Sequence, residues 1–117
     1  MKKIKTLKKN YEFQNVLKKG KFYVGKQIIV YILSNKNEQN SIGIAVSSKE
    51  FNAVQRNKIK RKIRENYRLI KNKLKPGNNI VFLWNKKNRG DSVDFHLIKK
   101  DMENIFTKAG ILKKWKR

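Results

Sequence analysis

The segment Asn52–Leu74 reads NAVQRNKIKRKIRENYRLIKNKL, and its apolar residues recur at the period of an α-helix. Spacings of 4, 4, 3 and 4 positions place them along one side of a helix of about five turns. The members of this apolar stripe are Ile59, Ile63, Tyr67, Ile70 and Leu74. A helix with one apolar side is stabilised mainly by packing that side on other elements. The segment therefore predicts a long amphipathic helix on a shared core.

Three apolar runs typical of β-strands flank this helix. Lys26–Leu33 (KQIIVYIL) and Ser41–Ser47 (SIGIAVS) precede it, and Asn79–Asn85 (NIVFLWN) follows it. The run KQIIVYIL is apolar at consecutive positions, which predicts a strand covered on both faces. If the second and third strands pair in parallel, the helix between them is their crossover connection.

Two further helices complete the pattern. Residues 10–19 carry Phe13, Val16 and Leu17 on one side, with Asn10 as the expected N-cap and Gly20 at the C-terminal end. A last helix is expected from Ser92, its predicted N-cap, to Ala109, with Gly110 past its end. The element order α-β-β-α-β-α predicts an α/β (α+β) two-layer sandwich, in which helices cover a small mixed sheet.

The composition points to a small, strongly basic protein. The chain has 117 residues, of which 31 are Lys or Arg and 8 are Asp or Glu, for a formal net charge of +23. This length predicts a single domain over residues 1–117, with a loose basic arm at 1–9 and a basic tail at 111–117. The absence of Cys excludes disulfides and thiolate metal sites. No run approaches the ~20 apolar residues of a membrane span, and we expect a cytoplasmic protein.

The charge is concentrated on the long helix. Between Arg56 and Lys75 there are ten basic residues and one acid, Glu65. Like charges at helical spacing repel one another, so a helix that keeps them is better explained by an anionic ligand than by a solvated face. One arc beside the apolar stripe holds Asn57, Lys60, Arg61, Arg64, Arg68 and Lys71. A field of this size favours nucleic acid as the partner, ahead of an anionic membrane.

Arginine placement refines this expectation. The chain has 25 Lys but only 6 Arg, and four of those lie within Arg56–Arg68. Arg grips phosphate with two parallel hydrogen bonds, whereas Lys acts as a point charge. A helix held between strands suits a structured RNA backbone better than the DNA major groove, and aromatic residues of the sheet could stack unpaired bases. We therefore expect RNA as the partner, with no DNA and no membrane.

A metal-dependent nuclease is the main enzymatic alternative. It would need converging carboxylates, and the acids that lie close together in sequence are Asp91, Asp94, Asp101 and Glu103. Acids at the start of a helix are usually caps, so we assign them no metal and no catalytic role. His96 is likewise assigned no chemistry. From the residues alone, Phe13 and Tyr31 are more typical of a core than of a ligand platform.

The ordered motif on the long helix resembles that of a known family. Ala53–Glu65 reads AVQRNKIKRKIRE, and it is similar to the signature A-V-x-R-N-R-x-K-R-x-x-R-E of the bacterial ribonuclease P protein component. Leu7-Lys8-Lys9 followed by Phe13, the strand with Tyr31, and Val46-Ser47 before the helix also match. The chain departs from the pattern at four positions. They are Leu17, where an aromatic is common, Ser48 and Phe51, where the family has Lys and Gly, and Lys58, where it has Arg.

The resemblance implies a fold and a function. The fold would be a compact α/β sandwich with a left-handed β-α-β crossover. The family protein binds a catalytic RNA, and the complex cleaves precursor tRNA to give the mature 5′ end. The RNA and its bound Mg²⁺ perform the hydrolysis, so the protein itself would supply no catalytic residue and hold no metal or cofactor.

The resemblance also assigns residues to two surfaces. The RNA-docking set carried over by the motif, with one arginine added by its arc, is Arg56, Asn57, Lys58, Lys60, Arg61, Arg64 and Arg68. The cleft that would face the 5′ leader of precursor tRNA has Phe13, Leu17 and Tyr31 as candidates. The alternative function is a ribosomal or other structured-RNA binding protein without a catalytic role.

Overall fold

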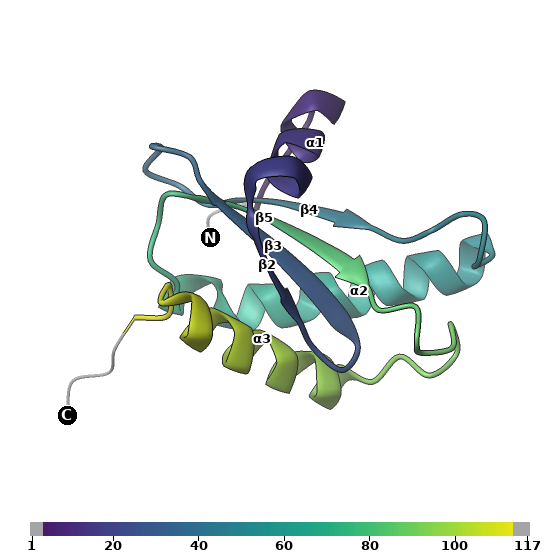
Figure 1. Ribbon diagram of the computed structural model, residues 1–117. Coiled ribbons are helices and arrows are strands. Elements are labelled where there is room, and N and C mark those ends of the chain that lie inside the picture. Colours follow the sequence, from purple (N-terminus) through teal and green to yellow (C-terminus); the bar gives the residue numbers. More distant parts are fainter. Residues whose placement is uncertain (1–3, 114–117) are drawn as a thin grey trace.

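The computed structural model describes residues 4–113 as a five-stranded mixed sheet flanked by helices (Figure 1). In chain order the strands and helices are β1 (Lys5–Thr6), α1 (Asn10–Lys19), β2 (Lys21–Val24), β3 (Ile28–Ser34), β4 (Ser41–Ala45), α2 (Ala53–Ile70), β5 (Asn78–Trp84) and α3 (Phe95–Ala109). A short 3-10 turn, η1 (Lys71–Lys73), follows α2. The strand order across the sheet is β1-β4-β5-β3-β2.

The pairing of the strands makes α2 a crossover helix. β4 and β5 lie side by side in parallel, and α2 connects them, which meets the condition under which the long helix is a crossover. β3 runs antiparallel to both β5 and β2, and β1 adds a parallel edge beside β4. The expected α+β sandwich with a mixed sheet is confirmed. The left hand of the crossover stays a prediction of the resemblance.

Two helices close one face of the sheet. α2 and α3 pack against each other and lie together on that face (Figure 1). All five residues of the predicted apolar stripe, four in α2 and Leu74 just after η1, are buried in the core. Phe82 of β5 is fully buried, and its ring lies 5.9 Å from that of Tyr67 in α2 and 6.2 Å from that of Phe106 in α3, both edge to face. Aromatic pairs in this arrangement add to the energy of burial.

Among residues 4–113, α1 is the helix that lies on the opposite face (Figure 1). Val16 of α1 and Val81 of β5 are both completely buried on this side. However, Ile29, Tyr31 and Leu33 of β3 are only half-buried. The prediction that this strand is covered on both faces is therefore met only in part, because α1 has 10 residues and is too short to cover the whole face.

Helix ends differ from the prediction at three places. The long helix, predicted to continue to Leu74, ends at Ile70 and is followed by η1. The N-cap of α1 is Lys9 rather than Asn10, and the Glu12 carboxylate accepts a hydrogen bond from the Lys9 N–H at 3.1 Å. The N-cap of α3 is Asp94, whose Oδ1 accepts from the backbone of His96 at 2.8 Å. Ser92, predicted for that position, lies in the preceding loop and donates to the Arg89 carbonyl. Gly110 ends α3 at a φ of 75°, as expected of a helix C-terminus.

Parts of the predicted arm and tail that the structure describes are paired with the rest of the fold. Residues 1–9 are predicted as a loose arm, but Lys5 and Thr6 pair with β4 and the Leu7 N–H donates to the Ile42 carbonyl at 2.9 Å. In the tail, the Lys113 N–H donates to the Lys73 carbonyl at 2.7 Å. Residues 1–3 and 114–117, the outer parts of the predicted arm and tail, lie outside the described residues. Within residues 4–113, no helix combines the length and apolarity needed to cross a membrane.

Candidate RNA-binding surface

α2 presents opposite sides to the core and to solvent. Its first turn is fixed by a reciprocal capping box, in which the Asn52 side chain accepts from the Gln55 N–H at 2.8 Å and Gln55 accepts from the Asn52 N–H at 3.1 Å. With the apolar stripe buried, the polar residues of the motif are turned outward. We call Arg56, Asn57, Lys58, Lys60, Arg61, Arg64 and Arg68 the cationic face of α2.

Most of the cationic face is open to solvent. Asn57, Lys58, Arg61, Arg64 and Arg68 are exposed, and Lys60 is half-buried. Glu65, the acid of this helix, lies 4.0 Å from the Lys62 ammonium, and Lys62 is not part of the face. A partly exposed pair of this kind contributes little to stability. The face therefore brings several positive charges together without an acid of α2 among them.

Arg56 has a structural contact at the start of the face. Its Nη1 donates to the Phe51 carbonyl at 2.7 Å, and the residue is half-buried. The bond ties the loop before α2 to the first turn of the helix. The Phe51 ring also packs close to Gly90. Arg56 therefore shapes the loop as well as adding charge.

A cavity of about 180 Å³ joins the cationic face to α1. Lys60 and Arg64 line it from α2, Phe13 from α1 and Gly43 from β4. A Cβ atom at Gly43 would lie 2.6 Å from Cε2 of Phe13, which is closer than real contacts allow. Only a glycine therefore lets the Phe13 ring lie against β4 at this point. The two predicted surfaces meet in this cavity.

The cleft candidates lie on the α1 side of the sheet. Gly43 pairs with Val81, and Val81 pairs with Tyr31, so the three residues form one row across β4, β5 and β3. Phe13 lies over the first member of this row. Phe13 and Tyr31 are both half-buried, so neither lies fully in the core or fully on the surface. Leu17 is half-buried on α1.

Three of the four acids considered for a nuclease have structural partners, and the fourth, Glu103, is exposed on α3. Asp94 caps α3, and Asp91 lies 3.3 Å from the Arg89 guanidinium. Asp101 is buried and accepts hydrogen bonds from the backbone N–H groups of residues 26, 27 and 28 at 2.9, 2.8 and 3.1 Å. Among residues 4–113, no three acidic or histidine side chains gather where they could hold a metal ion.

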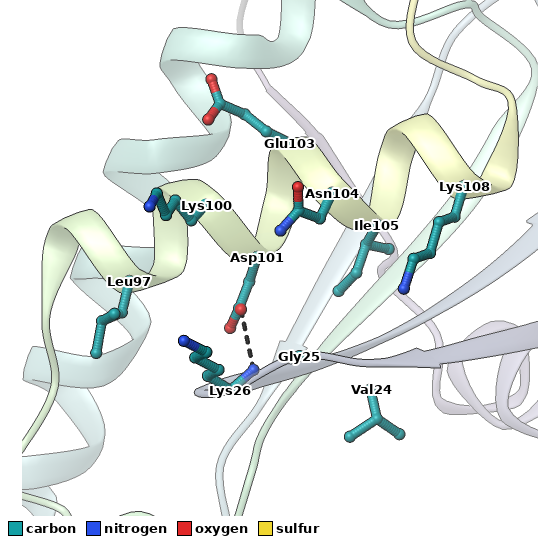
Figure 2. Close-up of a pocket in the computed structure, with 10 residues that line it drawn as sticks. All are labelled: Val24, Gly25, Lys26, Leu97, Lys100, Asp101, Glu103, Asn104, Ile105 and Lys108. Atoms are coloured by element: carbon teal, nitrogen blue, oxygen red, sulfur yellow. Dashed lines mark hydrogen bonds between the residues drawn. The ribbon is translucent and has the colours of Figure 1, made fainter.

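Figure 2 shows the cavity beside Asp101, with a volume of about 600 Å³ between α3 and the β2–β3 turn. Asp101 points to the Lys26 backbone nitrogen at its base. A Cβ at Gly25 would come within 2.5 Å of the carboxyl carbon, so the turn approaches α3 closely. Lys100 and Lys108 at its rim are exposed. We interpret this region as the joint that fastens the β2–β3 hairpin to α3.

Two residues near the cleft are absent from the sequence-based prediction. Gly43 carries a signal, because a glycine inside a strand often marks a close approach by another group. Phe22 carries none in its local pattern. Its ring lies 5.5 Å from that of Tyr31 at an interplanar angle of 30°, a pairing that depends on the register between β2 and β3.

Comparison with known proteins gives a consistent result. The family model described as Ribonuclease P matches residues 1–110. The chain is 35% identical over 114 residues to a ribonuclease P protein component of Natranaerobius thermophilus, covering 97% of each chain. It is 39% identical over 108 residues to that of Clostridioides difficile, covering 92% of this chain and 93% of the other.

Solved structures show the same likeness. The RNase P protein of Staphylococcus aureus matches with a TM-score of 0.79 at 33% identity, covering 95% of this chain and all of the other. The RNase P protein of Thermotoga maritima matches with a TM-score of 0.78 at 28% identity, covering 89% of this chain and 96% of the other.

Proposed function

This chain belongs to the ribonuclease P protein family, and we propose that it docks on the catalytic RNA through the cationic face of α2. The protein component of this family is part of a ribonucleoprotein endoribonuclease that acts in tRNA processing. The proposal goes further and assigns a binding partner to two surfaces of the chain. We also propose that the cleft beside α1 holds the 5′ leader of precursor tRNA.

The observation that carries the proposal is the meeting of the two surfaces at Phe13. Lys60 and Arg64 of the cationic face line the same cavity as the Phe13 ring. A single RNA strand that leaves a phosphate contact on Arg64 can therefore place its next base on an aromatic residue. Phosphate contacts position a nucleic acid, and base stacking on aromatic rings tolerates any sequence. A protein that assists cleavage of many precursor tRNAs needs this combination.

The division of labour follows from the side chains available. The cationic face supplies charge and bidentate hydrogen bonds to phosphate. Lys58 in place of the family arginine keeps the charge but loses the planar fork. In this proposal hydrolysis belongs to the RNA and its Mg²⁺, while the chain aligns the substrate leader with the RNA. The same proposal places the protein in the cytoplasm, where its RNA partners are made and processed.

Reconstitution tests the proposal directly. The protein is mixed with a bacterial ribonuclease P RNA and a precursor tRNA at low Mg²⁺, where the RNA alone is slow, and release of the 5′ leader is measured. We expect stimulation at stoichiometric protein. The double variant Arg61→Ala/Arg64→Ala should lose that stimulation, and the slope of log affinity for the RNA against log salt should become shallower by about one unit per lost phosphate contact.

A matched control removes the same charge from elsewhere. Lys99 and Lys108 are exposed on α3, and the variant Lys99→Ala/Lys108→Ala lowers the net charge by the same amount. Equal effects of the two double variants would attribute binding to overall charge and contradict an α2 interface. Tight RNA binding without any stimulation of cleavage would favour the alternative, a structured-RNA binding protein without a catalytic role.

A further inference from the structure

A row of residues crosses four strands on the α1 side of the sheet. The register pairs Gly43 with Val81, Val81 with Tyr31, and Tyr31 with Phe22. The row runs from the cavity that holds Phe13 at one end to the edge strand β2 at the other. Three steps between neighbouring strands span ~14 Å. The row therefore continues beyond the cleft residues that the family resemblance implies.

Phe22 is exposed to solvent, although phenylalanine is usually a buried residue. Its exposed fraction is 60%, and Val24 on the same strand and the same side is equally exposed. α1 packs on β3 and β5 and leaves β2 open. Burial of the Phe22 ring therefore contributes little to folding, since most of its apolar surface stays in water. The ring nevertheless has a fixed neighbour, because it lies 5.5 Å from Tyr31 and tilted by 30°.

The surroundings of this ring pair favour single-stranded RNA as the occupant. Lys18 and Lys19 are exposed in the last turn of α1, which lies on the same side of the sheet as Phe22 and leads directly into β2. Phosphates of a strand whose base lies on Phe22 would have these ammonium groups nearby. A stable protein partner would need about 800 Å² of surface on this side, which two rings do not provide.

We propose that Phe22 and Tyr31 form a base-stacking step at the far end of the cleft, which takes one unpaired base of the leader beyond those at Phe13. This inference rests on the proposed function, since it deepens the leader cleft. Its consequence is a dependence on leader length. A precursor tRNA gains the contact only when its leader is long enough to cross the row from Gly43 to Phe22.

The experiment measures affinity against leader length. The reconstituted complex is titrated with precursor tRNAs whose leaders grow by one nucleotide at a time, each with 2-aminopurine as the outermost base. For the unmodified protein we expect a final gain in affinity at one length, together with quenching of 2-aminopurine. Phe22→Ala should lose that final gain, about tenfold, and the quenching, while shorter leaders bind as before. Phe22→Tyr should restore both.

The controls separate this inference from its premise. Tyr11→Ala removes a ring that is 67% exposed on α1 outside the row, and it should follow the unmodified protein at every length. Thermal melting shows whether each variant is folded. If the unmodified protein responds to leader length and Phe22→Ala follows the same curve, the inference is wrong while the proposed function stands. If the unmodified protein does not respond to the leader at all, the proposed leader cleft itself fails.

A third outcome points to a different partner. β2 is an edge strand, and edge strands can pair with another chain. Sedimentation of the unmodified protein and of Phe22→Ala tests this. A loss of self-association in the variant, with leader binding unchanged, would assign the exposed ring to contact between two copies and overturn the RNA assignment.

Discussion

The two faces of the sheet use the same strands in different ways. On the side of α2 and α3, Val30 and Phe82 are completely buried. On the side of α1, Tyr31, which follows Val30 in β3, is half-buried and its ring lies against the exposed ring of Phe22. Because side chains alternate along a strand, every second residue of β3 packs in the core, and the residues between them line the open cleft. The closed face should therefore govern stability, and the open face should govern binding.

The largest effect is expected at the centre of the closed face. Phe82→Ala removes a ring that contacts Tyr67 and Phe106 edge to face. Truncating a fully buried phenylalanine costs about 3–5 kcal/mol of unfolding free energy. Denaturant titration followed by circular dichroism measures this loss. A loss below about 1 kcal/mol would mean that the closed face does not carry the stability assigned to it.

The joint between α3 and the hairpin comes next. Asp101→Asn replaces a buried carboxylate that accepts three backbone N–H bonds, and the amide nitrogen adds a donor facing other donors. We expect a loss of about 3 kcal/mol in unfolding free energy. Asp91→Asn alters an exposed acid and provides the control. Equal stability of the two variants would contradict a structural role for Asp101.

A buried tyrosine on the closed face gives a pH test of the comparison. Burial raises the pKa of Tyr67 from 10.0 to about 12. The folded state favours the neutral phenol. The stabilisation that neutral Tyr67 gives the folded state is therefore fully present below pH 10 and is lost as the pH rises from 10 to 12. Relative to Tyr67→Phe, the unmodified protein should lose about 2 kcal/mol across that window. Parallel stability curves for the two proteins would show that Tyr67 ionises freely.

The smallest change in stability is expected on the open face. Tyr31→Ala should weaken leader binding about tenfold, because a base loses its aromatic platform, while the melting temperature changes much less than in Phe82→Ala. Tyr31→Phe keeps the ring and should bind nearly as the unmodified protein does. A variant Tyr31→Ala that unfolds like Phe82→Ala would erase the distinction between the two faces.

The elements predicted from the sequence are those with a long, regular pattern. The predicted apolar stripe has five positions at helical spacing, four in α2 and Leu74 just after η1, and every one of them is buried. β1 has 2 residues and β2 has 4, which is too short for an alternating pattern to show. The caps Lys9 and Asp94 lie within two residues of those predicted, because a cap depends on local backbone angles that composition does not determine.

For the candidate site as well, the sequence predicts the local pattern of one element but not the contacts between elements. The exposure of Arg61, Arg64 and Arg68 follows from the helical arc and was predictable. The contact of Phe13 with Gly43 joins residues 30 positions apart, and the pairing of Phe22 with Tyr31 requires the register of a strand that the sequence does not reveal. Contacts between elements depend on topology, which the pattern of one element does not contain.

The crossover by α2 also sets an order of folding. β2 and β3 pair as neighbours in the chain through a short turn, so this hairpin can close early. β4 and β5 are neighbours only after the chain has passed through α2, and contacts between distant residues form late because loop closure costs entropy. We therefore expect α2 to pack in the same late step that completes the sheet. Repulsion among the side chains of its cationic face then slows that step, and polyanions, which screen the repulsion, should accelerate refolding more than they retard unfolding.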